Sequence, residues 1–213
     1  MELEEEHTRR ADELARVRRE LPWVRVDKPY RFETDGGTKT LAELFDGRSQ
    51  LLVDHFMFGP DWDAGCGGCS RVADHLDGGM LHLNQRDVTT VCLSRTSLEK
   101  ISACKRRMGW RFTWVWWLNS DFNHDFGAAF IEDQRANGAE SNFRGQGDPR
   151  EEAHGLSSFA LGDGVVDHVY STYARGTDVF NTFYRLVDRA PTGHDEENVP
   201  PGRWRRHDEY EEE

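Results

Sequence analysis

Cys66 and Cys69 are the residues of this sequence best suited to chemistry. They follow a mostly apolar run at residues 51–58, which predicts a buried strand, and they precede apolar residues at helical spacing. A thiol in the first turn of a helix meets unpaired backbone N–H groups and the positive end of the helix dipole, and both favour the thiolate. We therefore expect a redox-active dithiol, with Cys66 as the nucleophile and Cys69 as the resolving cysteine.

Two nearby carboxylates should oppose this activation. Asp61 and Asp63 lie in the turn-rich connector before the dithiol, and negative charges near a thiol raise its pKa. With the helix start acting in the opposite direction, we expect the pKa of Cys66 to lie between about 5 and 7.5.

A cysteine pair of this spacing could also be half of a zinc site. A structural zinc site needs two further ligands, but Cys92 and Cys104 do not form a second closely spaced pair. They lie in a predicted buried strand and on an apolar helix face, where packing is the more common role. His75 and His82 share a helix face without a convincing set of partners. We predict neither metal nor cofactor, and keep a zinc site or an inert pair as an alternative.

The acidic segment at residues 121–132 resembles a calcium-binding loop in its spacing. Its sixth position is Phe126, where the sharp turn of such a loop requires glycine, so calcium binding is not expected. Residues 121–127 should instead begin a helix or line the cleft.

The elements around the dithiol predict a parallel α/β core, because strands alternate with helices. The three expected strands are residues 51–58, 89–93 and 112–118. Gly78 and Gly79 are expected to interrupt the helix that follows the dithiol. A capping box made by Thr40 and Glu43 should begin a short helix at residues 41–45, and another made by Thr96 and Glu99 should begin the helix after residues 89–93. Trp114, Trp116 and Trp117 cannot all face one side of their strand.

The remaining chain predicts an antiparallel hairpin, a closing helix and two appendages. The hairpin joins residues 158–161 to 165–170, and the helix spans about residues 178–187. We divide the chain into an N-terminal helical extension at 1–22, a main domain at 23–190 and a polar tail at 191–213.

Composition limits the classes of partner. The chain has 213 residues, and 27 Lys and Arg against 39 Asp and Glu give it a net charge of −12. Such a surface repels phosphate backbones and anionic lipids, so nucleic acid and membranes are not expected partners. No apolar run reaches spanning length and no secretory signal is present, so we expect a cytoplasmic protein with reduced cysteines.

The order of elements resembles the thioredoxin fold in its peroxiredoxin-like form. More specifically, residues 23–210 resemble a bacterial family of thioredoxin-like proteins described as predicted dithiol-disulfide oxidoreductases. The motifs that carry this resemblance are Leu41-Ala42-Glu43-Leu44-Phe45-Asp46-Gly47-Arg48, Phe56-Met57-Phe58-Gly59, Asp61-Trp62, Gly65-Cys66 with Gly68-Cys69-Ser70, Ala73-Asp74-His75, Met108-Gly109-Trp110, Ser120-Asp121-Phe122-Asn123 with Asp125-Phe126, Tyr170-Ser171-Thr172-Tyr173-Ala174-Arg175-Gly176, and Trp204 with His207-Asp208-Glu209-Tyr210. The resemblance implies a three-layer α/β/α sandwich with a mixed central sheet and a dithiol chemistry, but no particular substrate.

The chain departs from these families at three places. Gly67 stands where the family usually has proline, residues 155–158 lack the cis-proline of thioredoxins, and Phe112-Thr113 replaces a common Phe-Pro pair. If Gly67 has a φ near −65°, the substitution Gly67→Pro should stabilise the fold by about 0.4–1 kcal/mol.

The expected activity is thiol-disulfide exchange on a disulfide-containing protein or a small thiol or disulfide. Trp62 would form a wall of the cleft, and Tyr173 and Arg175 are further candidates for substrate contact. One alternative is a thiol-dependent peroxidase that uses the same two cysteines. Another is a redox-inert binding module. The sequence leaves the oligomeric state open, including a homo-oligomer.

Overall fold

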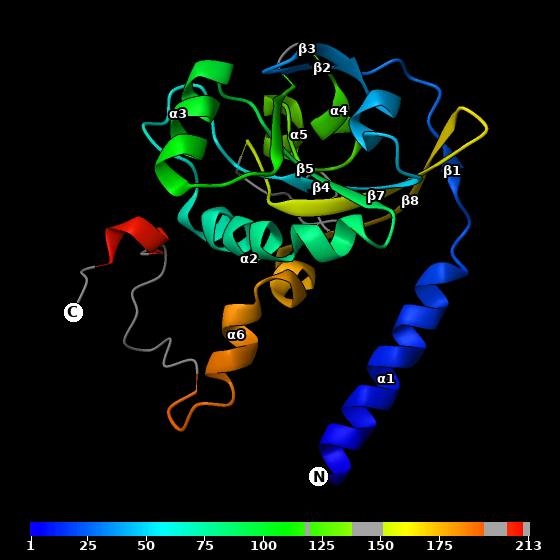
Figure 1. Cartoon of the computed structure of the whole chain (residues 1–213), viewed down its shortest axis with the longest axis vertical. Helices are drawn as coiled ribbons and strands as arrows, with labels where there is room; N and C mark the ends of the chain where they lie inside the picture. The colour runs from blue at the N-terminus through cyan, green and yellow to red at the C-terminus, as the bar shows by residue number, and fades with distance from the viewer. Residues whose placement is uncertain (118–119, 138–150, 194–203, 211–213) are drawn as a thin grey trace.

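A mixed sheet of eight strands forms the centre of the protein (Figure 1). The computed structural model describes residues 1–117, 120–137, 151–193 and 204–210. Across the sheet the strands run in the order β1-β8-β7-β4-β5-β6-β2-β3. Their bounds are β1 Val24–Arg25, β2 Arg31–Thr34, β3 Gly37–Thr40, β4 Gln50–His55, β5 Val88–Ser94, β6 Thr113–Trp116, β7 Gly155–Gly162 and β8 Val165–Tyr173.

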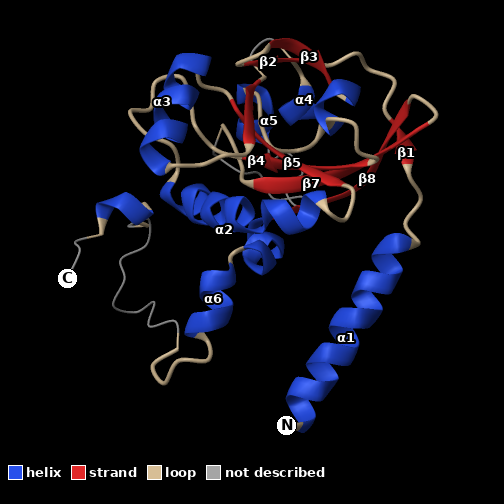
Figure 2. Cartoon of the chain, viewed as in Figure 1, coloured by secondary structure: helices blue, strands red, loops and turns tan. Residues whose placement is uncertain are grey.

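Helices cover both faces of this sheet (Figure 2). The α-helices are α1 Glu2–Arg19, α2 Gly67–Asn84, α3 Leu98–Met108, α4 Phe122–Asp125, α5 Glu132–Asn137 and α6 Thr182–Val187. Short 3-10 helices are η1 Ala42–Phe45, η2 Ala174–Phe180 and η4 His207–Glu209. Within the described part of the chain, no helix combines the length and apolar character needed to cross a membrane.

The connections confirm the predicted thioredoxin-like fold in its peroxiredoxin-like form. Strands β4, β5 and β6 are parallel, and α2 and α3 are the crossovers between them. Both crossovers step across the sheet in the same direction, so right-handed connections place both helices on one face. The β7–β8 hairpin adds two antiparallel strands on the other side of β4, which makes the sheet mixed.

The core is divided into two apolar clusters, one on each face of the sheet. The α2 and α3 face contains Phe56, Phe58, Cys69, Ala73, Cys92, Ile101, Met108, Trp110, Phe112 and Trp114. The opposite face contains Tyr30, Phe32, Leu41, Leu44, Phe45, Leu51, Val53, Val91, Leu93, Val115, Trp117, Phe122, Ala129, Phe159 and Val166. Alternation along β5 places the Cys92 side chain on the first face and those of Val91 and Leu93 on the second. The expected split of the tryptophans is confirmed, since Trp114 and Trp117 belong to different clusters.

The capping residues predicted at the starts of two helices are partly confirmed. Thr40 and Glu43 form the predicted capping box before η1, with each backbone N–H donating to the other side chain. The start of α3 is one residue later than predicted, because Ser97 rather than Thr96 is its N-cap and accepts from the backbone N–H of Lys100.

The predicted break in the dithiol helix is wrong, since α2 continues through Gly78 and Gly79. Val72, Ala73 and Leu76 bury their side chains against the sheet, and this packing outweighs the low helix propensity of the glycines.

The later elements follow the predicted order with different bounds. The hairpin turns through Asp163 and Gly164, which both have positive φ as a tight hairpin turn requires. The single closing helix is replaced by η2 and α6, which meet at Asn181 in a non-helical conformation. Residues 138–150 of the expected polar excursion lie outside the described residues, as do 194–203 of the tail.

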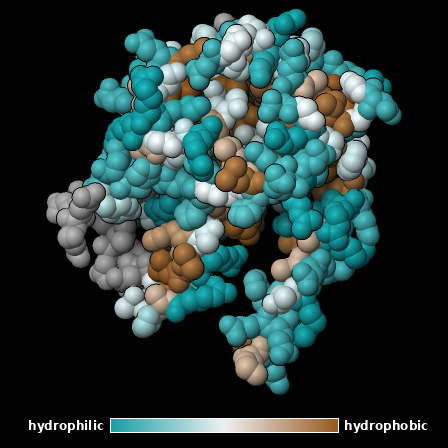
Figure 3. All heavy atoms as spheres, viewed as in Figure 1, coloured by the Kyte–Doolittle hydropathy of each residue, from teal (hydrophilic) through white to brown (hydrophobic). Residues whose placement is uncertain are grey.

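Helices α1 and α6 contribute no residue to either apolar cluster. Helix α1 projects away from the sheet and has no buried residue, although the guanidinium of Arg18 lies 5.2 Å from the ring centroid of Tyr170 (Figure 1). The face in Figure 3 is mainly hydrophilic, with a hydrophobic patch over α6. Phe183 and Leu186 of this helix are 41% and 64% exposed.

Candidate functional site

The dithiol lies at the start of α2, as predicted. Cys66 is the N-cap residue, and its backbone N–H donates to Met57 O over 3.0 Å. The backbone N–H and the hydroxyl of Ser70 both donate to Cys66 O over 2.9 Å. These bonds fix the helix start against the end of the strand that precedes it.

The two thiols differ in access. Cys66 is partly exposed, whereas Cys69 is 1% exposed and packs in the apolar cluster beneath the helix. An incoming reagent therefore reaches Cys66 first.

The two thiols also differ in acidity. A hydrogen bond from the Cys69 thiol lowers the pKa of Cys66 to about 6, against the opposing effect of burial. The backbone N–H groups of Cys69 and Gly68 and the nearby His154 contribute to the same lowering. Burial raises the pKa of Cys69 well above its usual value, and the charges on Cys66 and Asp54 raise it more. Cys66 is thus the thiolate of the pair and Cys69 its proton-bearing partner.

A buried ion pair lies beside the dithiol. Asp54 of β4 is fully buried, and its Oδ1 accepts from His154 Nε2 at 2.8 Å. Its Oδ2 is 3.5 Å from the Cys92 thiol, which donates to it. Burial lowers the pKa of His154, but Asp54 and the Cys66 thiolate outweigh it, so the net shift is upward. Both anionic neighbours therefore favour the imidazolium form of His154.

Sequence reasoning missed both members of this pair. Asp54 stood inside a run treated as apolar, and His154 lay near the end of the polar excursion. A carboxylate within a buried strand next to a dithiol was the available signal, because a buried charge requires a partner. Nothing near His154 in the sequence identified it as that partner.

The opposed effect of Asp61 and Asp63 is not found. Both residues are exposed, and neither is among the groups that shift the pKa of Cys66. The direction and range predicted for Cys66 agree with the structure, but the opposing influence is burial of the thiol.

Gly67 has a different role from the predicted one. A β-carbon at this position would lie 2.1 Å from Trp204 O, so the backbone of residue 204 occupies the space that any larger residue needs. The prediction that Gly67→Pro stabilises the fold is therefore wrong, although Gly67 is the first residue of α2 as expected.

The three expected substrate contacts differ in exposure and in their bonding partners. Trp62 is 41% exposed, and Lys100 Nζ donates to its carbonyl oxygen over 3.0 Å. Tyr173 is 7% exposed, and its hydroxyl donates to Phe126 O. Arg175 has a side chain that is 91% exposed and pairs with Asp178 at 3.0 Å. Contact of these residues with a substrate stays a prediction.

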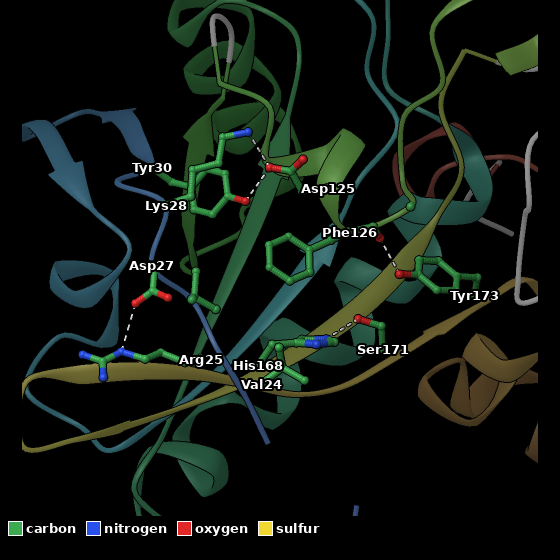
Figure 4. Close-up of a pocket in the computed structure, with 12 residues that line it drawn as sticks. Val24, Arg25, Asp27, Lys28, Tyr30, Asp125, Phe126, His168, Ser171 and Tyr173 are labelled. Carbon is green, nitrogen blue, oxygen red and sulfur yellow. Dashed lines mark hydrogen bonds and ion pairs between the residues drawn. The ribbon is translucent and has the colours of Figure 1, made fainter. Parts of the chain in front are cut away.

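A separate cavity of about 490 Å³ is lined by residues of β1, of β8 and of the segments 26–30 and 125–127 (Figure 4). Phe126 and His168 point into it, and Lys28, Tyr30 and Asp125 form a hydrogen-bonded group at one end. It is lined by Val24, Arg25, Val26, Asp27, Lys28, Tyr30, Asp125, Phe126, Gly127, His168, Ser171 and Tyr173. The dithiol does not line this cavity.

Residues 121–127 begin a helix, which is one of the two roles considered for them, and three of them line this separate cavity rather than a cleft at the dithiol. Asp121 is the N-cap of α4, and its carboxylate accepts from Lys28 Nζ at 2.6 Å. Asp125, Phe126 and Gly127 line the cavity, and Gly127 has a φ of 64°, which glycine adopts readily.

A chain of hydrogen bonds connects this cavity to a second buried histidine. His55 lies between Asn123 Oδ1 and Ser157 Oγ, with both distances 2.8 Å. Ser157 Oγ is 2.8 Å from Ser171 Oγ, which is 2.7 Å from His168 Nε2 at the cavity wall. Burial lowers the pKa of His55 to about 4, so this network is neutral.

Metal ligands do not gather in the part of the chain that the structure describes. No group there of three or more His, Cys, Asp or Glu side chains could hold a metal ion.

Solved structures that match this chain include several peroxiredoxins. A mutant of PrxQ from Xylella fastidiosa is 13% identical, with 74% of this chain and 89% of that chain covered and a TM-score of 0.49. Peroxidoxin BcpB from Mycobacterium tuberculosis is 10% identical, with 77% and 98% covered and a TM-score of 0.48. The bacterioferritin comigratory protein of Xanthomonas campestris is 11% identical, with 76% and 91% covered and a TM-score of 0.48.

Sequence comparison identifies a family without an assigned activity. No curated protein matches the chain. A family model described as "Bacterial protein of unknown function (DUF899)" matches residues 1–210. Since this match covers almost the whole sequence, the chain belongs to the DUF899 family.

Proposed function

We propose that this protein is a thiol-disulfide oxidoreductase that uses Cys66 and Cys69. The observation that carries the proposal is the asymmetry of the pair, in which an accessible thiol has a pKa of about 6 and a buried thiol has a raised pKa. The first is a thiolate at neutral pH and can attack, while the second stays protonated until it is needed.

The first step is attack by Cys66 Sγ on one sulfur of a substrate disulfide. The substrate S–S bond breaks, a mixed disulfide forms on Cys66, and the released thiolate takes a proton from His154. The raised pKa of His154 supports this role, because its imidazolium persists to higher pH than that of an ordinary histidine.

The second step resolves the mixed disulfide. Formation of that bond removes the Cys66 charge, which is one of the groups that raise the pKa of Cys69. Neutral His154 takes the Cys69 proton, Cys69 Sγ attacks Cys66 Sγ, and the second substrate thiolate leaves with the proton returned by His154. Two electrons pass from the dithiol to the substrate, which leaves as two thiols, and the enzyme keeps a disulfide.

The test is reduction of hydroxyethyl disulfide, followed together with the mass of the protein. Cys66→Ser should abolish turnover, whereas Cys69→Ser should stop after one mixed disulfide because the resolving thiol is absent. Cys104→Ser is the matched control and should keep the activity, since Cys104 is a half-buried thiol of α3 with a raised pKa. Turnover by Cys66→Ser at the rate of the unmodified protein would contradict the proposal.

A peroxidase activity is the second candidate. It is favoured by the restricted space beside Cys66, where Trp204 O lies against Gly67. The Cys66 thiolate would attack a hydroperoxide oxygen, giving a sulfenic acid and an alkoxide that takes a proton from His154. Cys69 would then displace water from the sulfenic acid to form the same disulfide. Faster consumption of a hydroperoxide than of hydroxyethyl disulfide would favour this activity. Metal analysis of the purified protein tests the remaining alternative, an inert module with a zinc site.

A further inference from the structure

Residues 204–210, here called the covering segment, lie across the loop that carries the dithiol. Trp204 O occupies the space where a β-carbon of Gly67 would be, and Trp204 Cδ1 would be 3.7 Å from a β-carbon of Gly68. These two glycines are the residues between the cysteines. The chain therefore covers its own dithiol with a segment more than a hundred residues away in sequence.

Polar contacts hold the covering segment at both sides of the dithiol. Arg206 donates through Nη2 to Gly65 O, next to Cys66. His207 Nδ1 is 2.7 Å from Asp74 Oδ1 of α2. From α3, Arg107 pairs with Asp208 and with Glu209, the latter at 3.1 Å.

An aromatic group holds the beginning of the segment. The guanidinium of Arg71 in α2 lies 3.8 Å from the ring centroid of Trp204 and 4.7 Å from that of Phe183. Tyr184 completes the group at 5.5 Å from Arg71 and meets Trp204 edge to face. Arg71 is 9% exposed and its Nη1 has no hydrogen-bond partner among the residues that the structure describes, so aromatic faces supply its main contacts there.

This arrangement leaves a narrow approach to the reactive thiol. Cys66 keeps part of its surface in solvent, but the loop and the two glycines beside it contact the covering segment. A folded protein would have to place its own backbone beside Cys66, where this segment already lies. A small disulfide has no such requirement.

We propose that the covering segment restricts the dithiol to small disulfides and excludes those of folded proteins, an inference that rests on the proposed function. The substrate class is thus a low-molecular-weight disulfide, which enters beside the segment and reaches Cys66.

The test compares Arg206→Ala with Arg205→Ala. Both remove one arginine from the covering segment, but Arg205 is exposed whereas Arg206 holds the dithiol loop. Loss of the charge-assisted hydrogen bond from Arg206 to Gly65 O should raise the fraction of molecules with an uncovered dithiol about tenfold. Arg206→Ala should therefore reduce insulin disulfides about tenfold faster than the unmodified protein, with its hydroxyethyl disulfide rate within about twofold. Arg205→Ala should change neither rate.

A second variant removes the cover in another way. Trp204→Ala deletes the ring that stacks on Arg71 and should also increase insulin reduction. Equal insulin rates in the unmodified protein, Arg206→Ala and Trp204→Ala would overturn the inference. So would fast insulin reduction by the unmodified protein.

A labelling experiment separates this inference from the proposed function. N-ethylmaleimide and a polyethylene-glycol-linked maleimide are compared at Cys66 by peptide mass, which needs no turnover. The unmodified protein should react slowly with the bulky reagent, and Arg206→Ala and Trp204→Ala should react with both reagents at similar rates. If the unmodified protein reacts faster with N-ethylmaleimide than with the bulky maleimide but reduces no disulfide, the proposed function is rejected and the covering role of residues 204–210 stands. Equal labelling of the unmodified protein by both reagents would reject the cover alone.

Discussion

Neighbouring residues of β4, Asp54 and His55, belong to two buried polar networks on opposite faces of the sheet. On the dithiol face, Asp54 pairs with His154. On the other face, His55 lies between the neutral groups of Asn123 and Ser157. Alternation along the strand is what separates the two networks.

The two buried histidines respond to burial in opposite ways. Burial favours the neutral imidazole in both cases. The pKa of His55 falls to about 4, because hydrogen bonds to neutral partners do not offset that effect. The pKa of His154 rises, because Asp54 and the Cys66 thiolate stabilise the imidazolium. The identity of the partner, rather than burial, therefore decides which network can exchange protons near neutral pH.

Removal of Asp54, the charged partner of His154, should have the largest effect on the rate of disulfide reduction. Asp54→Asn leaves His154 buried with the Cys66 thiolate as its remaining counter-charge, so the pKa of His154 should fall and the proposed proton transfers should slow. We expect the reduction of hydroxyethyl disulfide to fall about 100-fold, as for loss of general acid–base catalysis. The matched change on the other face, Asn123→Ala, should leave the rate per folded molecule unchanged. Similar losses in both variants would mean that the difference between the networks is not functional.

The neutral network should make the protein sensitive to acid. An unfolded histidine titrates near 6.5, whereas folded His55 titrates near 4, so between these values the unfolded state binds more protons. His55 should therefore reduce stability as pH falls through this window, by about 1.4 kcal/mol per pH unit.

Urea unfolding of the unmodified protein and of His55→Gln, at several pH values across this window, measures the effect. The free energy of unfolding of His55→Gln should fall less steeply with acid. Parallel curves for the two proteins would show that His55 is not held neutral. His154 has the opposite sign, because its raised pKa adds stability below 6.5 that is lost as pH rises through the folded value.

A smaller effect is expected on the pKa of Cys66 when His154 is replaced. His154→Gln removes a positive charge that lowers the pKa of Cys66, so this pKa should rise above about 6. We expect less than about one unit, equivalent to a tenfold change in the acid dissociation constant. The midpoint of the pH dependence of iodoacetamide alkylation measures the shift. A midpoint that stays the same or moves down would place His154 outside the electrostatic range of the thiol.

The smallest effect is expected for the exposed carboxylates before the dithiol. Replacing both Asp61 and Asp63 with asparagine should leave the alkylation midpoint of Cys66 unchanged, because both are exposed and neither is among the main influences on its pKa. Faster alkylation at neutral pH in this double variant would show that exposed charges, and not only buried ones, control the thiol.

Features that depend on neighbouring residues could be predicted from the sequence. The strand, the dithiol and the helix after it are continuous, so their order indicated both the fold and the position of Cys66. The capping box of Thr40 and Glu43 was found for the same reason, since its partners are three residues apart.

Features that depend on strand register could not be predicted. His154 reaches Asp54 because β7 pairs with β4 so that Gly155 lies opposite His55. The two residues are one hundred positions apart, and no local pattern encodes that register. The cover over Gly67 also depends on residues that are far apart in the sequence. A glycine that helps a tight turn looks identical in sequence to one that makes room for a distant backbone.

The separation between the dithiol loop and its cover also has a consequence in time. Translation proceeds from the N-terminus, and domains begin to fold as they emerge. Every strand of the sheet lies before residue 174, so a growing chain can form the dithiol site before Trp204 has emerged from the ribosome. We expect a nascent chain stalled with residues 1–173 outside the ribosome and residue 204 still inside it to react readily with the bulky maleimide, and the released protein to react slowly. Newly made molecules would then pass through a brief unselective stage, in which contact with the disulfides of other proteins depends on how fast residues 204–210 leave the ribosome.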